Sequence, residues 1–266
     1  MKNAVEAVRP YYNATAFHTN SALLRAGLLT EQVFYNGNSQ TICPPPSRYG
    51  FGCEQITEDG RIYNEGIALS CADTDANLII DVGAHVGRYA VLLGAFNNGE
   101  LHCFEPEGRN RRILQSVLVA NGIDASVHPH VVTDRNGSVE FFVDPRSGSE
   151  SHSIKTNSDF ETVRSPCISL RKFIEGKSPE LAYAKIDAEG AEDRILPDLF
   201  DVNTPVEGLV ELHPERIDGD TRELINECKS VFAVFREVGD TSPNHPHADT
   251  IDFPTNRPGY WFETHD

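Results

Sequence analysis

The segment LIIDVGAHVGRYA (78–90) places a carboxylate and two glycines between an apolar run and the start of a helical pattern. Gly83 and Gly87 let the backbone approach a ligand closely, and the following helix N-terminus offers unpaired N–H groups. A dinucleotide site would have GxGxxG spacing, with a pyrophosphate over the helix end. The spacing here is GxxxG, and Asp81 would repel a pyrophosphate but can accept hydrogen bonds from an ammonium group. S-adenosylmethionine carries such a group, and its carboxylate can take backbone donors, although many turns of this kind use glycine for packing only.

Glu105 ends the segment LHCFEP, 22 positions after Gly83. A carboxylate at the end of this second strand is placed to accept both ribose hydroxyls of an adenosine. Taken alone, it could equally be a solvated acid at a strand end. Together with the Asp81 turn it indicates NAD or S-adenosylmethionine, and Asp81 and the missing GxGxxG favour S-adenosylmethionine.

Three carboxylates lie close together in KIDAEGAE (185–192), where Asp187 ends a strand and Glu189 and Glu192 follow. Folding alone explains them poorly because like charges repel, although Glu192 would be favourable in the first turn of a helix. Such groups can act as a base, accept a hydrogen bond from a substrate hydroxyl or bind a metal ion. We assign no metal ligand from the sequence alone.

The segment VELHPE brings Glu211 and His213 to the end of the next strand. Imidazole titrates near neutral pH, so His213 could deprotonate a hydroxyl. The structural alternative is that His213 caps a helix that begins near Pro214.

The elements that must position these groups alternate between strand and helix from residue 77 onward. Apolar runs predict strands at 78–82, 100–105, 126–132, 136–143, 167–170, 181–187, 206–212, 231–238 and 260–264, and helical spacing predicts helices at 86–96, 108–122, 191–200 and 215–229. This alternation predicts an α/β fold with a doubly wound, mostly parallel sheet. Ligands of such sheets bind at the carboxyl ends of the strands, where the four polar clusters lie.

Two segments differ from this pattern. We expect an N-terminal cap over residues 1–75, packed on a main domain of residues 76–266. The cap is predicted to contain a helix at 21–29, strands near 31–35 and 51–56, and a helix at 65–72. The polar segment 144–159 predicts a mobile loop.

The composition indicates a protein with an acidic surface. There are 40 Asp and Glu against 23 Lys and Arg, a formal net charge of −17, which disfavours nucleic acid as a partner. No apolar run reaches the roughly 20 residues of a membrane span, and the N-terminus lacks the apolar core of a signal peptide, so we expect a cytoplasmic protein. The six cysteines include no CxxC pair, which favours free thiols. Dense carboxylates with few lysines would suit a high-salt cytoplasm.

Four segments resemble the FkbM family of S-adenosylmethionine-dependent methyltransferases: IIDVGAHVGRYAVLLG, HCFEPEGRNRRILQSVLVANG, VVTDRNGSVEFF and YAKIDAEGAEDRIL. They follow the family's order and spacing over about residues 77–213, half of the chain, and the combination of DVGAxxG, FEP and KIDxEGAE is specific. The family usually has Asn in place of His85 and Val in place of Ala188. Residues 1–75 and 240–266 carry no comparable match.

The resemblance implies a class I methyltransferase fold with a seven-stranded, Rossmann-like sheet. It also implies an enzyme that methylates, most often, a hydroxyl oxygen of a sugar, glycan or natural product. Carried over by position, the residues that line the methionine part of the cofactor are Asp81, Gly83, Ala84, His85, Val86 and Gly87. Glu105 should hold the ribose, and Thr133 and Asp134 should lie near the adenine.

On the acceptor side, the resemblance implies that Asp187 and Glu189 face the sulfonium and the acceptor. Asp187 or His213 would remove the hydroxyl proton as the oxygen attacks the methyl group. Two alternatives remain open, an NAD-dependent enzyme on a related sheet and a catalytically silent, cofactor-binding scaffold in a glycan assembly complex.

Overall fold

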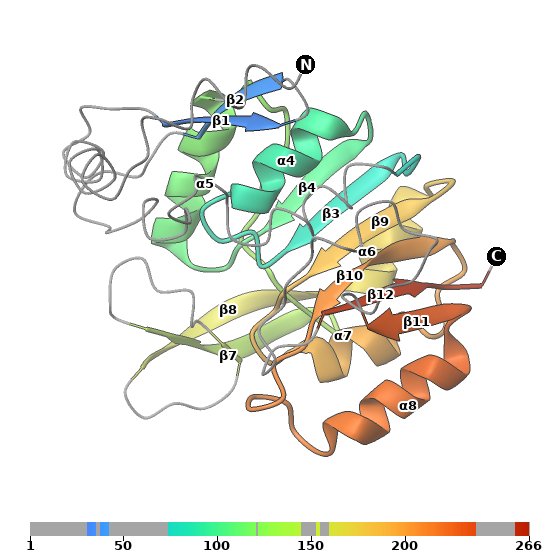
Figure 1. Ribbon diagram of the computed structural model, residues 1–266. Coiled ribbons are helices and arrows are strands. Elements are labelled where there is room, and N and C mark those ends of the chain that lie inside the picture. Colours follow the sequence, from blue (N-terminus) through green and yellow to red (C-terminus); the bar gives the residue numbers. More distant parts are fainter. Residues whose placement is uncertain are drawn as a thin grey trace, which may run out of the picture.

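The computed structural model describes residues 31–35, 38–42, 74–120, 122–144, 153–154, 160–237 and 259–265. Its centre is a seven-stranded sheet in the order β11-β12-β10-β9-β3-β4-β5 (Figure 1). These strands are β3 (Leu78–Val82), β4 (Glu100–Phe104), β5 (Ser126–His128), β9 (Ala182–Ile186), β10 (Val206–Glu211), β11 (Val234–Glu237) and β12 (Gly259–Glu263). The strands from β10 to β5 pair in parallel, whereas β12 is antiparallel to both β10 and β11. The predicted doubly wound, mostly parallel sheet is therefore confirmed.

The order of the strands reverses between β3 and β9. The chain adds β4 and β5 on one side of β3, then crosses over and places β9 and β10 on the other side. The two strands are direct neighbours, with Asp81 opposite Lys185 in the register. In open α/β sheets the crevice at such a reversal is where ligands bind, so this end of β3 and β9 is the first place to look for a site.

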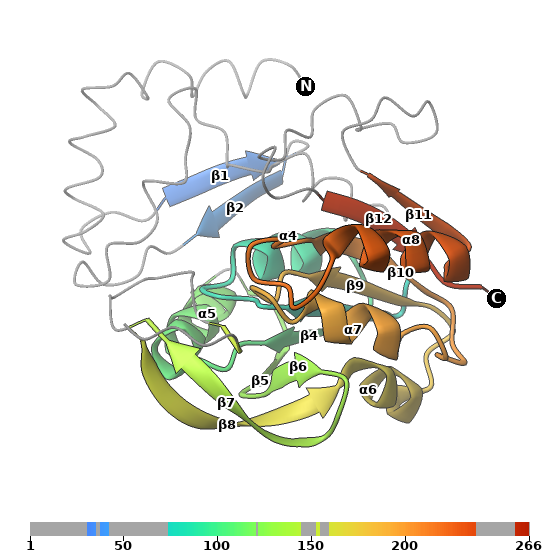
Figure 2. The ribbon, with the colours of Figure 1, turned by 90° about the horizontal axis from the view of Figure 1, so that it is seen from below.

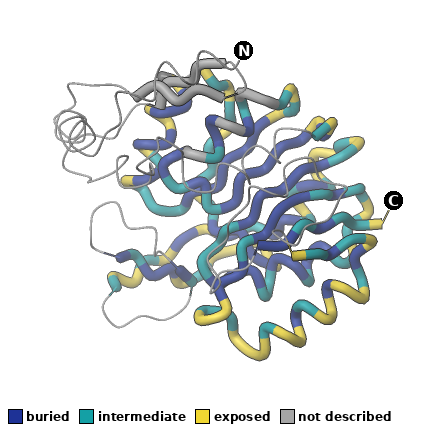
Figure 3. Tube along the Cα trace, in the orientation of Figure 1, coloured by how far each residue is buried: buried dark blue, intermediate teal, exposed yellow. Residues whose placement is uncertain are grey.

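In the described part of the chain, five helices cover the two faces of this sheet. They are α4 (Arg88–Phe96), α5 (Gly108–Ala120), α6 (Leu170–Lys177), α7 (Glu192–Asp198) and α8 (Thr221–Val231). Because side chains alternate along a strand, Ile80 and Ile186 pack with α6, α7 and α8, whereas Ile79 and Tyr183 pack with α4 and α5. Figure 3 shows the resulting buried centre.

A three-stranded sheet in the order β6-β8-β7 lies beside the main one (Figure 2). It consists of β6 (Val131–Thr133), β7 (Gly137–Val143) and β8 (Glu161–Ser169). The single strand predicted at 126–132 is therefore wrong, because β5 pairs with β4 in the main sheet and β6 pairs with β8 in the small one. Pro129 lies at the break, and it has no N–H for a strand ladder.

Other element boundaries shift by a few residues. The helix predicted at 215–229 begins only at Thr221, because the Asp220 side chain accepts the Arg222 N–H at 2.8 Å and caps the helix there. The strand predicted at 167–170 is the end of the longer β8, and helix α6 begins directly after it. Within the predicted loop 144–159, Ser153 forms an isolated bridge with Phe142, and most other positions lie outside the described residues.

In the predicted cap, strands β1 (Glu31–Tyr35) and β2 (Asn38–Ile42) form an antiparallel hairpin. The strand expected near 31–35 is present, whereas 21–29, 51–56 and 65–72 lie outside the described residues. The division of the chain at residue 75 therefore stays a prediction. Cys103, Cys167 and Cys228 are buried free thiols, as predicted. Within the described ranges, no helix has the length and apolar character needed to cross a membrane.

Candidate active site at the switch in strand order

The ends of β3 and β9 lie against each other. The Asp187 N–H donates to the Val82 carbonyl at 3.1 Å, which continues the pairing of the two strands beyond β9. A Cβ atom on Gly83 would lie 1.9 Å from the Asp187 carbonyl oxygen, and Gly83 has a φ of +74°. Glycine is therefore required at this position by the close approach of the two strand ends.

The turn after β3 is held by the end of β4. The N–H groups of Gly83 and Ala84 both donate to the Phe104 carbonyl at 3.0 Å, and the His85 N–H donates to Oε2 of Glu105 at 2.9 Å. The first two amides are thus engaged within the protein, and they shape the turn. The His85 amide connects two predicted site residues directly, His85 and Glu105.

The remaining turn residues have distinct roles in packing. His85 has a φ of 50°, in the left-handed region that Asn tolerates well, which gives a physical reason for the Asn usual in the FkbM family. Val86 is buried with Val91 and other apolar side chains, so its own side chain belongs to the core. Gly87 precedes α4 with a φ of +98°, and a Cβ atom there would lie 2.8 Å from Leu114.

Glu105 lies at the end of β4, as predicted, and its carboxylate is buried. Besides the His85 amide, it accepts the Glu107 N–H on Oε1 at 2.7 Å. Burial raises the pKa of Glu105 to about 8, although both backbone hydrogen bonds favour the ionised form. The side chain is thus fixed in position by two backbone donors.

A buried lysine separates two of the predicted site acids. Nζ of Lys185 lies 3.6 Å from Asp81 and 3.2 Å from Asp187, and 4.6 Å from the centre of the Tyr89 ring on α4. Burial alone would lower the pKa of Lys185, but the charges of Asp187 and Asp81 raise it above its usual value. Burial raises the pKa of Asp81, and the charge of Lys185 offsets part of this effect. The three groups form a row of alternating charge from β3 to β9, with the lysine between the two acids.

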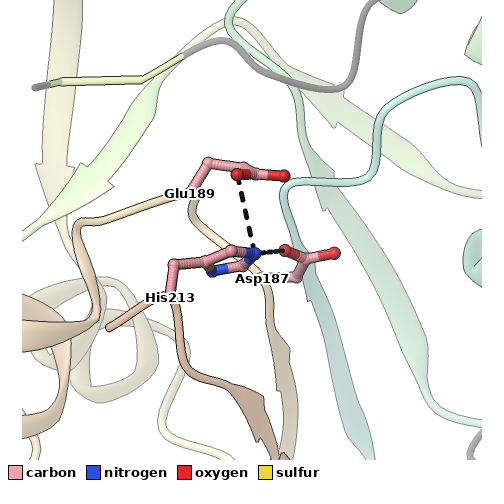
Figure 4. Close-up of side chains that lie close together, drawn as sticks. All are labelled: Asp187, Glu189 and His213. Carbon is pink, nitrogen blue, oxygen red and sulfur yellow. Dashed lines mark ion pairs between the residues drawn. The ribbon is translucent and has the colours of Figure 1, made fainter. Parts of the chain in front are cut away.

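His213, after β10, faces the same strand end from the other side (Figure 4). Its Nε2 lies 3.5 Å from Glu189 and 3.7 Å from Asp187, and its Nδ1 lies 2.9 Å from Glu192. Burial alone would lower the pKa of His213, but the hydrogen bond and charge of Glu192, with the charges of Asp187 and Glu189, raise it to about 9. The side chain is fully buried, and it does not cap a helix as the structural alternative proposed.

Glu192 differs from the other two acids of KIDAEGAE. It is fully buried, and it accepts the Ala188 N–H on Oε1 at 3.1 Å and the Gly190 N–H on Oε2 at 2.9 Å. Glu192 therefore holds the loop between β9 and α7 and orients His213. Glu189 is paired with Arg216 instead. The repulsion expected among three acids is thus relieved by cations and backbone donors.

Thr133 and Asp134 are not brought to this cluster. They lie at the end of β6 in the small sheet, where the Thr133 hydroxyl donates to Asp134 at 2.9 Å. Among the described residues no hydrogen bond or ion pair joins either of them to Asp81, Glu105 or His213. Their place beside an adenine stays a prediction.

Two site residues were missed in the sequence, Lys185 and Arg216. The signal for Lys185 was available, because a lysine inside the strand AYAKI, buried at every position, must have a buried acid as partner. Its place two residues before Asp187, on the same side of the strand, indicates one such acid. Arg216 lies in a turn that carries no comparable pattern.

A model of the methyltransferase FkbM domain matches residues 81–239, more than half of the chain. No curated protein sequence matches. Many solved structures are similar to this chain at low sequence identity. One is a Pyrococcus abyssi tRNA (uracil-54, C5)-methyltransferase bound to S-adenosyl-L-homocysteine, with 12% identity over 88% of this chain and 44% of that one, at a TM-score of 0.43.

Two further structures are similar to the same degree. The T. thermophilus 16S rRNA N2 G1207 methyltransferase RsmC is 11% identical over 89% of this chain and 50% of its own, with a TM-score of 0.45. The ribosomal protein L11 methylase of Lactobacillus delbrueckii is 11% identical over 81% of both chains, with a TM-score of 0.41. The chain spans about half the length of the two RNA methyltransferases. The family match, with the predicted motifs and the seven-stranded sheet, identifies a class I methyltransferase fold, and the chain belongs to the methyltransferase FkbM domain family.

Proposed function

We propose that this protein transfers a methyl group from S-adenosylmethionine to a hydroxyl oxygen of a sugar, glycan or other small acceptor. The observation that carries the proposal is the pair of buried carboxylates, Asp81 and Glu105, at the ends of adjacent strands beside the switch in strand order. The pair lies in a chain of a methyltransferase family.

The buried acids suit this cofactor. Neither carboxylate oxygen of Asp81 has a hydrogen-bond partner among the described residues, and a buried acceptor of this kind suits an ammonium group. Glu105 is held by two backbone donors and can still accept hydrogen bonds from ribose hydroxyls, since a carboxylate has about four acceptor positions. When bound, S-adenosylmethionine supplies a methyl group on a positively charged sulfur.

The chain's own groups then position the acceptor and take up its proton. Oδ1 of Asp187 and Nε2 of His213 lie 3.7 Å apart at the end of β9, beside the Asp81 and Lys185 pair. A pKa raised to about 9 keeps His213 protonated near neutral pH, so Oδ1 of Asp187 accepts the hydroxyl proton there. Glu192 fixes the orientation of His213 through Nδ1. Such positioning accounts for a large part of the rate increase in transfer reactions. The net charge of −17 argues against a polyanionic acceptor.

Calorimetric titration with S-adenosylhomocysteine tests the cofactor assignment. We expect one binding site in the wild type, and affinity reduced at least tenfold in Asp81→Asn and in Glu105→Ala. Asp124→Asn, an exposed acid after α5, is the matched control and should bind like the wild type. Unchanged affinity in both site variants would overturn the assignment, and a melting temperature raised by NAD instead of S-adenosylhomocysteine would support the dehydrogenase alternative.

A further inference from the structure

Asp187, Glu189 and His213 form a cluster that suits a cation, and we propose that it binds a divalent metal ion such as Mn²⁺. One ligand atom of each residue lies within 4.8 Å of the other two. Figure 4 shows the three side chains turned toward one another from the ends of β9 and β10. Binding of the ion does not depend on the proposed function, whereas its role toward an acceptor does.

The distances within the cluster favour a shared ion over direct pairing. Nε2 of His213 lies 3.5 Å from Glu189 and 3.7 Å from Asp187, whereas charge-assisted hydrogen bonds are about 2.7–2.9 Å long. Two ligands that share an ion at about 2.1 Å are roughly 3.0–4.2 Å apart, depending on the angle between them. Both distances from Nε2 of His213 fall within that range, and the ligand atoms of Asp187 and Glu189 lie within 4.8 Å of each other.

His213 is oriented as a metal ligand would be. Its side chain is fully buried, and Nε2, which faces the two acids, has no hydrogen-bond partner among the described residues. Nδ1 is paired with Glu192 at 2.9 Å, and the backbone donors of Ala188 and Gly190 hold Glu192 in turn. A carboxylate behind the far ring nitrogen is the usual support of a metal-binding histidine, because it fixes both the tautomer and the ring orientation.

The charges around His213 leave room for a divalent cation. Four carboxylates lie within 4.0 Å of its ring nitrogens, those of Asp187, Glu189, Glu192 and Glu211. Lys185 contacts Asp187, and Arg216 contacts Glu189. Lys185 is also shared with Asp81. A divalent ion among the four carboxylates would reduce the repulsion between them.

The ligand set also indicates which ions would bind. Two carboxylates and one imidazole suit ions that accept both oxygen and nitrogen, such as Mn²⁺. Three protein ligands leave positions open on the ion, and a hydroxyl bound there becomes a stronger acid. With the ion bound, His213 is a ligand, and the acidified hydroxyl of the acceptor would release its proton to a water molecule instead of to the imidazole.

The test is a titration of the full, chelator-treated chain with Mn²⁺, in which electron paramagnetic resonance measures the unbound ion. We expect one bound Mn²⁺ per chain. In Asp187→Asn and Glu189→Gln the affinity should fall at least tenfold, with circular dichroism confirming that each variant is folded. Glu227→Gln, an exposed acid on α8, is the matched control and should bind Mn²⁺ like the wild type.

Pulsed electron paramagnetic resonance on the wild type gives a second result that needs no variant. We expect coupling of the bound Mn²⁺ to one imidazole nitrogen. Absence of stoichiometric Mn²⁺ binding, or absence of this nitrogen coupling, would overturn the metal site. A chain that binds Mn²⁺ in this way but does not bind S-adenosylhomocysteine would keep the metal site and refute the proposed function, so the two failures are distinguishable.

Discussion

Glu105 combines burial with two backbone hydrogen bonds, and these act on its ionisation in opposite directions. Its pKa is raised from 4.5 to about 8 by burial, despite the amides of Glu107 and His85. In the folded protein Glu105 is therefore protonated over a pH range in which the same residue is ionised in the unfolded chain. The folded state binds more protons than the unfolded state between these two pKa values.

We therefore expect Glu105 to make the protein less stable as the pH rises from about 5 to 8. Each pH unit in this window should lower the free energy of unfolding by at most about 1.4 kcal/mol. Urea unfolding of the wild type and of Glu105→Gln measures this, because Gln keeps the shape without titrating. The free energy of unfolding of the wild type, minus that of Glu105→Gln, should fall as the pH rises. The same dependence on pH in both proteins would contradict the expectation.

A site residue could be predicted from the sequence where it directly follows an apolar run, because the run marks a strand and the residue then lies at the strand end. Asp187, Glu189 and His213 are brought together because parallel strands end at the same edge of a sheet. The sequence could not distinguish Glu192 from its neighbours, since its burial depends on how the loop folds back onto it. It also could not show that Lys185 contacts Asp81, because that depends on β3 and β9 being neighbours.

At the scale of the elements, the approach of β3 to β9 determines the geometry of the whole site. The two strand ends meet at Gly83 without a side chain between them. Any group at that position must push the end of β9 away, and the Asp187 side chain would move with it.

The variant Gly83→Ala tests this approach, with Gly122→Ala as control. Both glycines have positive φ angles, +74° and +67°, but a Cβ atom at Gly122 meets nothing within 4 Å. The control should lose about 1 kcal/mol in the free energy of unfolding, which is the backbone cost alone. Gly83→Ala should lose about 2 kcal/mol more, because its Cβ meets backbone that cannot rotate away. Equal losses in urea unfolding would show that the two strand ends are not in close contact.

The order and type of the elements were predictable, but some of their pairings were not. Apolar runs of five or six residues between helical patterns marked β3, β4, β9 and β10 correctly. The segment 126–132 was misread because periodicity cannot show that a chain leaves one sheet at Pro129 and joins another. The helix predicted from residue 215 is too long, because the Asp220 side chain caps the helix and it begins at Thr221.

At the scale of the whole molecule, the net charge of −17 opposes folding through repulsion among surface carboxylates. Salt screens such charges, with a Debye length of about 10 Å at 0.1 M. The ion pairs of Lys185 with Asp81 and Asp187 are buried and are screened much less.

We expect the melting temperature to rise by several degrees between 10 mM and 0.5 M NaCl, and then to level off as screening becomes complete. Differential scanning calorimetry over a series of salt concentrations measures this. A matched series in sucrose controls for exclusion of solutes from the surface, because sucrose stabilises without screening. A melting temperature that is constant in NaCl, or rises equally in sucrose, would contradict the charge argument and the hypothesis of a high-salt environment.

The position of β12 has a consequence for how the protein folds as it is synthesised. Its residues Gly259–Glu263 lie between β10 and β11, which precede it by more than twenty residues in the chain. Until these residues leave the ribosome, the edge of β10 has unpaired backbone groups, and β11 cannot join the sheet. An exposed strand edge is a template for pairing with other chains. The nascent protein is thus most exposed to aggregation just before synthesis of this segment ends, and a chaperone that covers strand edges would act at that moment.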